Sequence, residues 1–204
     1  MPERTQTLYK TPFSPAYWRQ ACASFRDLRG MMFAALMIAV CIILGRFSIP
    51  VTDGLRITFG FMARALCALV YGPVGVMVFA VAEDTLSFIL TSGNGSPYFP
   101  GYMITTLLGC LIYALFFYRT RITVARIFVA KLLTNLLNVF LGSLWSAVLY
   151  SKGYWFYMTT SAWKNAALLI PQTIMLVVLF QALLPALHRM YIIPKQVDGR
   201  IRLL

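Results

Sequence analysis

Long runs of apolar residues separated by short polar stretches dominate this chain, and the first run shows the pattern most clearly. Between Arg29 and Phe47 the interior is apolar, and the only charged residues, Arg29 and Arg46, stand near its two ends. A helix over residues 30–45 rises about 24 Å at about 1.5 Å per residue, and flanking residues cover the rest of a hydrocarbon core about 30 Å thick. The run therefore predicts a membrane-spanning helix.

Five further apolar runs predict the remaining spans. They cover about 57–71, 74–90, 102–118, 122–150 and 166–187. The second and third spans are separated only by Gly72-Pro73, which a helix does not continue through, so we expect them to form a helical hairpin. The chain is thus expected to be an all-α integral membrane protein, with a six-helix membrane domain over 28–187 between an N-terminal arm (1–27) and a tail (188–204).

The Lys and Arg residues indicate the orientation of this bundle. Twelve of the 18 lie in the arm or at the adjoining Arg29, in or beside the connection between the fourth and fifth spans (Arg119, Arg121 and Arg126), or in the tail. Six spans place both termini on one side of the membrane, and an excess of Lys and Arg marks the cytoplasmic side. We therefore expect both termini to be cytoplasmic. The net charge of +12 reflects this topology and attraction to anionic lipid rather than binding to nucleic acid.

Composition excludes a soluble domain, because 60% of the residues are hydrophobic, only 12% are charged and the mean hydropathy is +0.75. The four cysteines show no C-x-x-C spacing, so we expect neither a disulfide nor a metal site, and no cofactor. An intramembrane enzyme, such as a lipid-modifying transferase, is poorly supported because the sequence lacks an acidic metal-binding cluster and a serine paired with a base. It also lacks a phosphate loop, so any dependence on ATP must come from partner proteins.

Charged residues inside the spans are expensive in a membrane and therefore mark structural or functional sites. Arg64 lies in the second span, and Glu83 and Asp84 lie in the third. Counted from the shared turn at about 1.5 Å per residue, Arg64 is about 12 Å deep and the acids are about 15 Å deep. We expect Arg64 to pair with one acid, either to let the hairpin insert or to bind a ligand.

The fifth span carries a polar stripe formed by Lys131, Asn135, Asn138, Gly142 and Trp145. These residues follow one another at steps of four, three, four and three, so in a regular helix they share one face. Lipid does not tolerate such a face. We expect it to line the interior of the bundle or a cavity.

The last span adds polar residues that could converge with this stripe. Lys164 and Asn165 stand at its expected mouth, and Gln172 follows Asn165 by two helical turns. Buried amides can simply hold helices together. They can also form a pocket for a flat ligand, because a primary amide offers a donor and an acceptor in one plane and an aromatic ring can stack on the ligand.

Residues outside the spans could complete such a pocket. Phe99, in the turn-rich loop between Thr91 and Gly101, could close over a ligand. Arg46, Arg56 and Lys164 make the outer mouth basic, which suits an anionic tail. The pattern therefore favours a heteroaromatic anion that enters from outside.

Ala35 and Ala39 lie four residues apart in the first span, so both small side chains lie on one helical face. Such a face lets another helix approach closely. The partner could be a different protein or a neighbouring helix of this chain.

Several short motifs together resemble one family. They are the first span with its Ala35/Ala39 face, Leu55-Arg-Ile-Thr-Phe-Gly-Phe61, Tyr71-Gly-Pro-Val-Gly75 followed by Asp84, Tyr98-Phe-Pro-Gly-Tyr102, Lys131-Leu-Leu-Thr-Asn135 and Trp163-Lys-Asn165. Over about residues 26–187 this set resembles the substrate-binding S components of energy-coupling-factor (ECF) vitamin transporters, and it is most similar to the folate-specific branch.

The resemblance implies a subunit of the bacterial plasma membrane that binds folate at the extracellular side and has no ATPase of its own. It also implies that Ala35 and Ala39 dock on a transmembrane T component, which couples to two cytoplasmic ATPases. S components for riboflavin, thiamine or pantothenate remain alternatives. The expected ligand-binding residues are Arg46, Arg56, Asp84, Phe99, Asn135, Asn138, Trp145, Lys164, Asn165 and Gln172.

Overall fold

The computed structural model of this chain describes residues 17–18, 28–52, 55–91, 99–150, 153–190, 192–194, 201 and 203. Its helices are α2 (Leu28–Arg46), α3 (Phe61–Thr91), α4 (Pro100–Phe117), α5 (Val124–Leu137), the π-helical turn η3 (Asn138–Gly142), α6 (Ser143–Tyr150) and α7 (Tyr154–Arg189). Its strands are β1 (Ser48–Thr52) and β2 (Leu55–Thr58). The mainly helical architecture expected from the apolar runs is confirmed for these residues.

A short β-hairpin connects α2 to α3, and the sequence pattern does not predict it. Strands β1 and β2 pair antiparallel, with Ser48 opposite Thr58 and Pro50 opposite Arg56. The expected start of the second span at residue 57 is therefore wrong, because Ile57 lies in β2 and the helix begins at Phe61. β-Branched residues favour strands on both sides of the turn, whereas an apolar run alone does not distinguish a strand from a helix end.

Helix α3 reverses direction at Gly72, which has φ of 69° and is followed by Pro73. Arg64 and Glu83 are 19 residues apart, a rise of about 28 Å in a straight helix, yet their side chains are in contact. The expected hairpin is therefore confirmed. A Cβ at Gly72 would lie 2.9 Å from the Tyr118 ring, so both the backbone angle and the space require glycine there.

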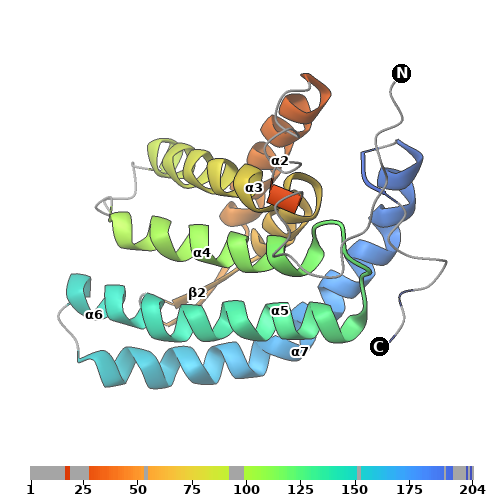
Figure 1. The fold of residues 1–204 in the computed structure, drawn as a ribbon. Coiled ribbons are helices and arrows are strands. Elements are labelled where there is room, and N and C mark those ends of the chain that lie inside the picture. Colours follow the sequence, from red (N-terminus) through yellow and green to blue (C-terminus); the bar gives the residue numbers. More distant parts are fainter. Residues whose placement is uncertain are drawn as a thin grey trace.

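The helices α5, η3 and α6 form one continuous rod over 124–150, close to the fifth expected span. Thr123 caps its start by accepting a hydrogen bond from Arg126 N. The last helix begins at Tyr154 instead of residue 166, so the expected start is wrong. Trp155, Phe156 and Tyr157, which precede the expected start, lie in its first turns. Prolines at 171 and 185 each remove a backbone donor from α7, which changes direction along its length in Figure 1.

The helices pack as neighbours in two groups (Figure 1). Helix α3 contacts α2 and α4, while the α5–α6 rod lies between α4 and α7. Where α3 packs on its neighbours, its buried positions are often small, including Ala63, Ala65, Ala68 and Ala80. Small residues allow close helix–helix approach, which is how membrane helices gain packing contacts.

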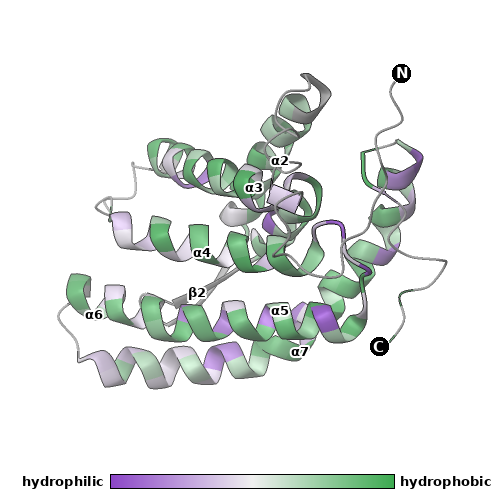
Figure 2. Cartoon of the chain, in the orientation of Figure 1, coloured by the Kyte–Doolittle hydropathy of each residue, from purple (hydrophilic) through white to green (hydrophobic). Residues whose placement is uncertain are grey.

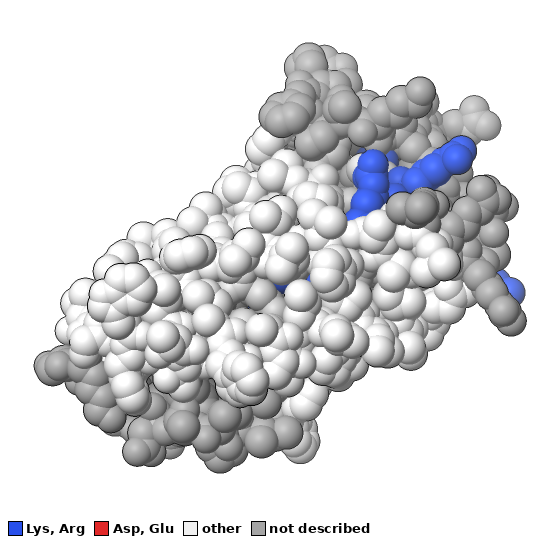
Figure 3. Space-filling model, turned by 90° about the horizontal axis from the view of Figure 1, so that it is seen from below, with Lys and Arg blue, Asp and Glu red and all other residues white. Residues whose placement is uncertain are grey.

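Hydrophobic residues occupy most positions of the helices (Figure 2), and many of them are exposed on the outside of the bundle. Within the described part of the chain, four helices are long and apolar enough to cross a membrane, and a shorter apolar helix covers Met31–Gly45. Basic side chains gather at one end of the elongated molecule in Figure 3, and the long face beside them is almost free of charge. The molecule is therefore a membrane protein.

Parts of both terminal segments contact the helices. Tyr17 is fully buried, its hydroxyl donates a hydrogen bond to Ala114 O at 3.1 Å, and burial raises the pKa of its phenol. At the other end of the chain, Ala125 N donates to Leu203 O at 3.2 Å and Ile201 N donates to Gln181 Oε1 at 3.0 Å. The remainder of the expected arm and most of the expected tail lie outside the described residues.

Candidate functional site

A cavity of about 70 Å³ lies between α3, α4 and α5. Each of the three helices contributes both polar and apolar residues to its described lining. The lining residues are Phe61, Arg64, Thr105, Thr106, Gly109, Cys110, Tyr113, Lys131, Thr134, Leu137 and Asn138. Since two of these side chains are cationic and several carry hydroxyl or amide groups, the cavity suits a polar ligand.

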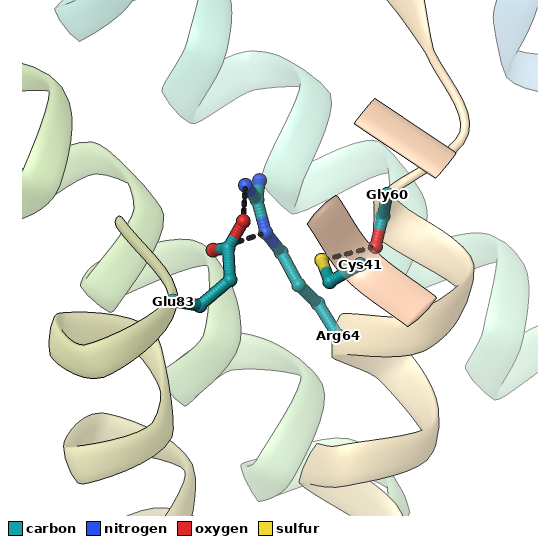
Figure 4. Close-up of polar contacts among 4 residues, drawn as sticks. All are labelled: Cys41, Gly60, Arg64 and Glu83. Carbon is teal, nitrogen blue, oxygen red and sulfur yellow. Dashed lines mark hydrogen bonds and ion pairs between the residues drawn. The ribbon is translucent and has the colours of Figure 1, made fainter. Parts of the chain in front are cut away.

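The first cation, Arg64, forms a two-pronged ion pair with Glu83 across the α3 hairpin (Figure 4). Arg64 Nε donates to Glu83 Oε2 at 3.2 Å, and Arg64 Nη2 donates to Oε1 at 3.1 Å. The expected pairing is confirmed with Glu83 as the acid, while its neighbour Asp84 is half-buried on a different side of the helix. This pair is close to neutral overall and leaves little charge for a ligand.

The second cation, Lys131, has no such partner. Its side chain is 5% exposed, its Nζ lies 4.2 Å from the centre of the Phe61 ring, and it donates a long hydrogen bond to the Tyr113 hydroxyl at 3.5 Å. Among the described residues no carboxylate oxygen comes within ion-pair distance of it. Contact with an aromatic ring offsets only part of the cost of burying an ammonium group. The cavity therefore holds a buried basic group that no described carboxylate neutralises.

The β-hairpin connection reaches deep into the bundle beside this cavity. Phe61 is the first residue of α3, yet it meets Lys131, which is about 10 Å along α5 from its start. The preceding Gly60 carbonyl accepts a hydrogen bond from Cys41 Sγ at 3.5 Å (Figure 4). The chain that links α2 to α3 thus forms one wall of the site.

An aromatic cluster stands beside the cavity on α4 and α6. Trp145 Nε1 donates to Thr105 Oγ1 at 3.0 Å, and the Trp145 ring lies 5.6 Å from the Phe99 ring. Gly101 fits beneath both rings, because a Cβ there would lie 2.3 Å from Phe99 and 2.6 Å from Trp145. Phe99 and Trp145 therefore lie against each other beside the cavity.

Two of the expected amides lie in the seam between α5 and α7. Asn135 Nδ2 donates to the backbone oxygen of Asn165 at 3.1 Å, and Asn165 Nδ2 donates to Ser161 O at 2.9 Å. Neither amide is part of the described cavity lining. These contacts fit the reading in which buried amides hold helices together.

The expected polar stripe does not continue along the whole rod, because η3 interrupts the regular helix. Lys131 and Asn135 are buried as expected, but Asn138 is exposed where the cavity opens. Val139 and Ser143 take the next buried positions instead. A π-turn bonds i to i+5 and so shifts the facing of every later residue.

The remaining expected residues are dispersed. Lys164 is half-buried within α7 and not at its mouth, because the helix starts ten residues earlier. Gln172 is buried, and its Oε1 is without a hydrogen-bond partner. Arg46 ends α2 and Arg56 lies in β2, with side chains outside the described set.

Comparison with known proteins decides the family. The family model described as "ECF transporter, substrate-specific component" matches residues 29–194. This chain belongs to the ECF S components. They are substrate-specific parts of transporters and not enzymes.

Two curated relatives of this S component carry the name folate transporter FolT. The protein from Clostridium novyi (strain NT) is 29% identical over 137 residues, covering 67% of this chain and 78% of the relative. The protein from Leuconostoc mesenteroides subsp. mesenteroides is 28% identical over 130 residues, covering 63% and 69%. A crystal structure of FolT bound with folic acid superposes with a TM-score of 0.67 at 25% identity, covering 74% of this chain and 91% of that one.

Several lining residues of this S component were not expected from its sequence. Thr105, Gly109 and Tyr113 follow one another at steps of four on α4, so they share a face of the helix. That spacing was the signal available, but hydroxyl groups and glycine are common in membrane helices. The sequence pattern did not indicate that Phe61 lines the cavity, since its position there depends on how the β-hairpin packs against the helices.

Proposed function

We propose that this S component binds folate from the extracellular side and delivers it to the cytoplasm. The observation that carries the proposal is the buried Lys131 without a carboxylate partner, in a cavity also lined by Thr134 and Asn138. Folate is an anion with a flat ring rich in donors and acceptors, and it therefore matches both features. The similarity to FolT proteins, one of them bound with folic acid, supports the same ligand.

The same charge argument ranks the alternative vitamins. Thiamine is a cation and would be repelled by Lys131, and riboflavin is uncharged and leaves the ammonium unpaired. Pantothenate is an anion but has no flat ring for the amide and hydroxyl groups to recognise. Folate alone among these four vitamins supplies both properties.

Folate binding requires the cavity to widen. Sites for ligands of this size usually enclose about 300–1,000 Å³, well above the volume present here. Two parts of the structure beside the cavity are the best placed to move: the Phe99–Trp145 cluster lies outside the hydrophobic core, and Phe61 is only partly buried against it. We propose that the ligand enters between them and contacts the exposed Asn138 before the buried Lys131.

The other expected site residues have roles that fit their positions. Asn135 and Asn165 keep α5 on α7 and thereby fix the direction of Lys131. Lys164 and the two arginines, Arg46 and Arg56, attract the anionic tail of folate through long-range charge. Asp84 and Gln172 would contact the ligand only after the cavity has widened.

The topology proposed for the membrane has six passes, counting the two arms of α3 separately. The α4–α5 connection carries Arg119, Arg121 and Arg126 and is therefore assigned to the cytoplasmic side. This assignment puts the β-hairpin outside and both termini in the cytoplasm. The protein is then a multi-pass subunit of the bacterial plasma membrane.

The proposed partners are a transmembrane T component and two cytoplasmic ATPases. Ala35 and Ala39 are both exposed on α2, on a face that includes Met32, Leu36 and Ile43. Replacing either alanine with tryptophan should abolish uptake by the assembled transporter and leave folate affinity unchanged, because the ring fills the groove that a partner helix must enter. Equal losses of binding and uptake would show that the face packs internally.

Identification of the ligand tests the central proposal. Protein purified from cells grown in rich medium should release folate when denatured, as detected by mass spectrometry. Isothermal titration of ligand-free protein should then give tight binding for folate and none for thiamine, riboflavin or pantothenate. Tight binding of any of those three, with none for folate, would overturn the assignment.

A further inference from the structure

The π-turn η3 changes which residues of the α5–α6 rod face inward. Buried positions recur at every fourth residue, at Lys131, Asn135, Val139 and Ser143. In a regular α-helix each four-residue step turns by about 40° beyond a full circle, so three steps would rotate the buried face by about 120°. The wider π-helical turn over Asn138–Gly142 holds one extra residue, which offsets this rotation and keeps the buried residues on one face.

The same turn determines where Trp145 points. In an unbroken helix, Trp145 would lie within about 40° of the direction of Lys131, because the two are 14 residues apart. The indole would then project toward the cavity. The extra residue in the π-turn rotates the Trp145 side chain by about 100° away from that direction. Accordingly, Leu137 and Asn138 line the cavity but Trp145 is absent from its described lining.

Independent contacts hold the indole in this outward position. Its Nε1 donates to Thr105 Oγ1 at 3.0 Å, and its ring occupies the space that the missing Cβ of Gly101 leaves open. The neighbouring Ser146 hydroxyl donates to Gly142 O at 2.9 Å, inside the π-turn, and lies 3.1 Å from the Tyr102 hydroxyl on α4. These contacts bind the segment after the turn to α4.

The turn also has a local cost. Ser143 is 2% exposed, and its buried Oγ has no hydrogen-bond partner among the described residues. In a regular helix a serine hydroxyl can donate to the carbonyl four residues earlier, as Ser146 does. Ser143 stands directly after the widened turn and lacks that contact. An unfavourable feature beside a cavity points to function, because folding stability alone would favour the regular helix.

We propose that the π-turn is a positioning device that swings the Trp145 indole out of the cavity and onto α4, which leaves the volume free for the ligand. Trp145 is thereby the residue that sets the size of the cavity, and Gly101 is the positioning residue that receives it. The ligand identity in this inference rests on the proposed folate function. The role of the turn does not.

Deletion of Leu141 tests the turn directly, since it leaves too few residues for a π-turn and restores regular helix. The variant should bind folate about tenfold more weakly or worse, because the indole now fills the cavity. Adding Trp145→Ala to the deletion should restore binding to the level of Trp145→Ala alone, because the deletion weakens binding only when the indole is present. A folded deletion variant that binds like the wild type, or one that Trp145→Ala does not rescue, would overturn the proposal.

A second variant keeps the test valid if the deletion prevents folding. Gly101→Ala pushes the indole off α4 without changing the backbone of the rod, and it should also weaken binding until Trp145→Ala is added. Gly45→Ala is the matched control, because a Cβ there meets nothing within 4 Å. Wild-type affinity from Gly101→Ala would contradict the inference.

A measurement without ligand separates this inference from the folate assignment. With Trp18, Trp155 and Trp163 replaced by phenylalanine, fluorescence reports on Trp145 alone. Its emission maximum should shift in the deletion variant, since the indole leaves Thr105 and moves beside Lys131. An unshifted maximum would overturn the inference even if folate binds, and a shift would support it even if wild-type protein binds no folate.

Discussion

Two polar regions lie side by side along α5, and they differ in whether their groups already have partners. In the α5–α7 seam, Asn135 and Asn165 donate hydrogen bonds to backbone or serine oxygens. In the cavity, Lys131 has only an aromatic ring and a long contact to a hydroxyl. Satisfied amides stabilise a helix pair, whereas an uncompensated buried cation is a cost that a bound anion can remove. The comparison therefore separates packing from binding within one helix face.

The Arg64–Glu83 pair is a third kind of polar site, because both groups are charged, Glu83 is buried, Arg64 is partly buried, and each is the other's partner. Arg64→Leu should lower the free energy of unfolding by about 3–5 kcal/mol, because it leaves Glu83 buried without a partner. The double variant with Glu83→Leu should be clearly more stable than either single variant. Thermal unfolding in detergent measures the effect.

Asp84→Asn serves as the control for this prediction, because Asp84 is outside the ion pair. It should change the unfolding temperature little. A double variant as unstable as the worse single variant would mean that the two charges do not compensate each other.

Lys131→Met should produce the opposite pattern, with lost binding and retained stability. Removing an ammonium that a folate anion would neutralise should weaken affinity by about 10- to 100-fold, equivalent to about 1.4–2.7 kcal/mol. The unfolding temperature should stay the same or rise, since an uncompensated buried charge disappears. Titration calorimetry and a melting curve on one preparation check both parts, and unchanged affinity would remove Lys131 from the site.

Asn135→Ala tests whether the α5–α7 seam serves helix packing and not ligand binding. It removes the donor to the Asn165 backbone oxygen and should cost about 0.6–2 kcal/mol of stability, with folate affinity nearly unchanged. Asn165→Ala is a matched control, because that backbone oxygen remains. It should cost less. A fivefold loss of affinity in either variant without loss of stability would place the seam in the binding site.

Lys164→Ala should have the smallest effect, because Lys164 is half-buried and acts through screened charge. Folate affinity should fall by about threefold at low salt, and the difference should shrink as salt is raised. Titrations at two ionic strengths measure it. A loss that is independent of salt would indicate direct contact with the ligand.

The sequence predicted those features that follow from the free-energy cost of placing particular residues in a membrane. An arginine within an apolar run needs an acid at matching depth, and Glu83 met that need across a reversal marked by Gly72-Pro73. The length and order of most helices followed from the apolar runs for the same reason. The β-hairpin did not, since Ile57 and its neighbours satisfy both a strand and a helix end.

The site itself was less predictable because it depends on packing between distant segments. Counting residues at 3.6 per turn aligned Asn138 and Trp145 with Lys131; Asn138 does line the cavity with Lys131, but the π-turn broke the alignment of Trp145 without a clear mark in the sequence. The start of α7 was missed because Trp155 and Phe156 are as common at membrane surfaces as in helices. Neither the contact of Phe61 with Lys131 nor the proximity of Thr105 to Trp145 can be derived from spacing within one helix.

The reversal at Gly72 also constrains how this protein is made. An arginine or an acid alone in the middle of a membrane helix raises the cost of insertion by about 3 kcal/mol. Arg64 and Glu83 neutralise each other only when both arms of α3 are in the bilayer. During synthesis the first arm of α3 is therefore stable in the bilayer only once the second arm is inserted beside it. All of residues 61–91 must leave the ribosome before either arm is stably inserted.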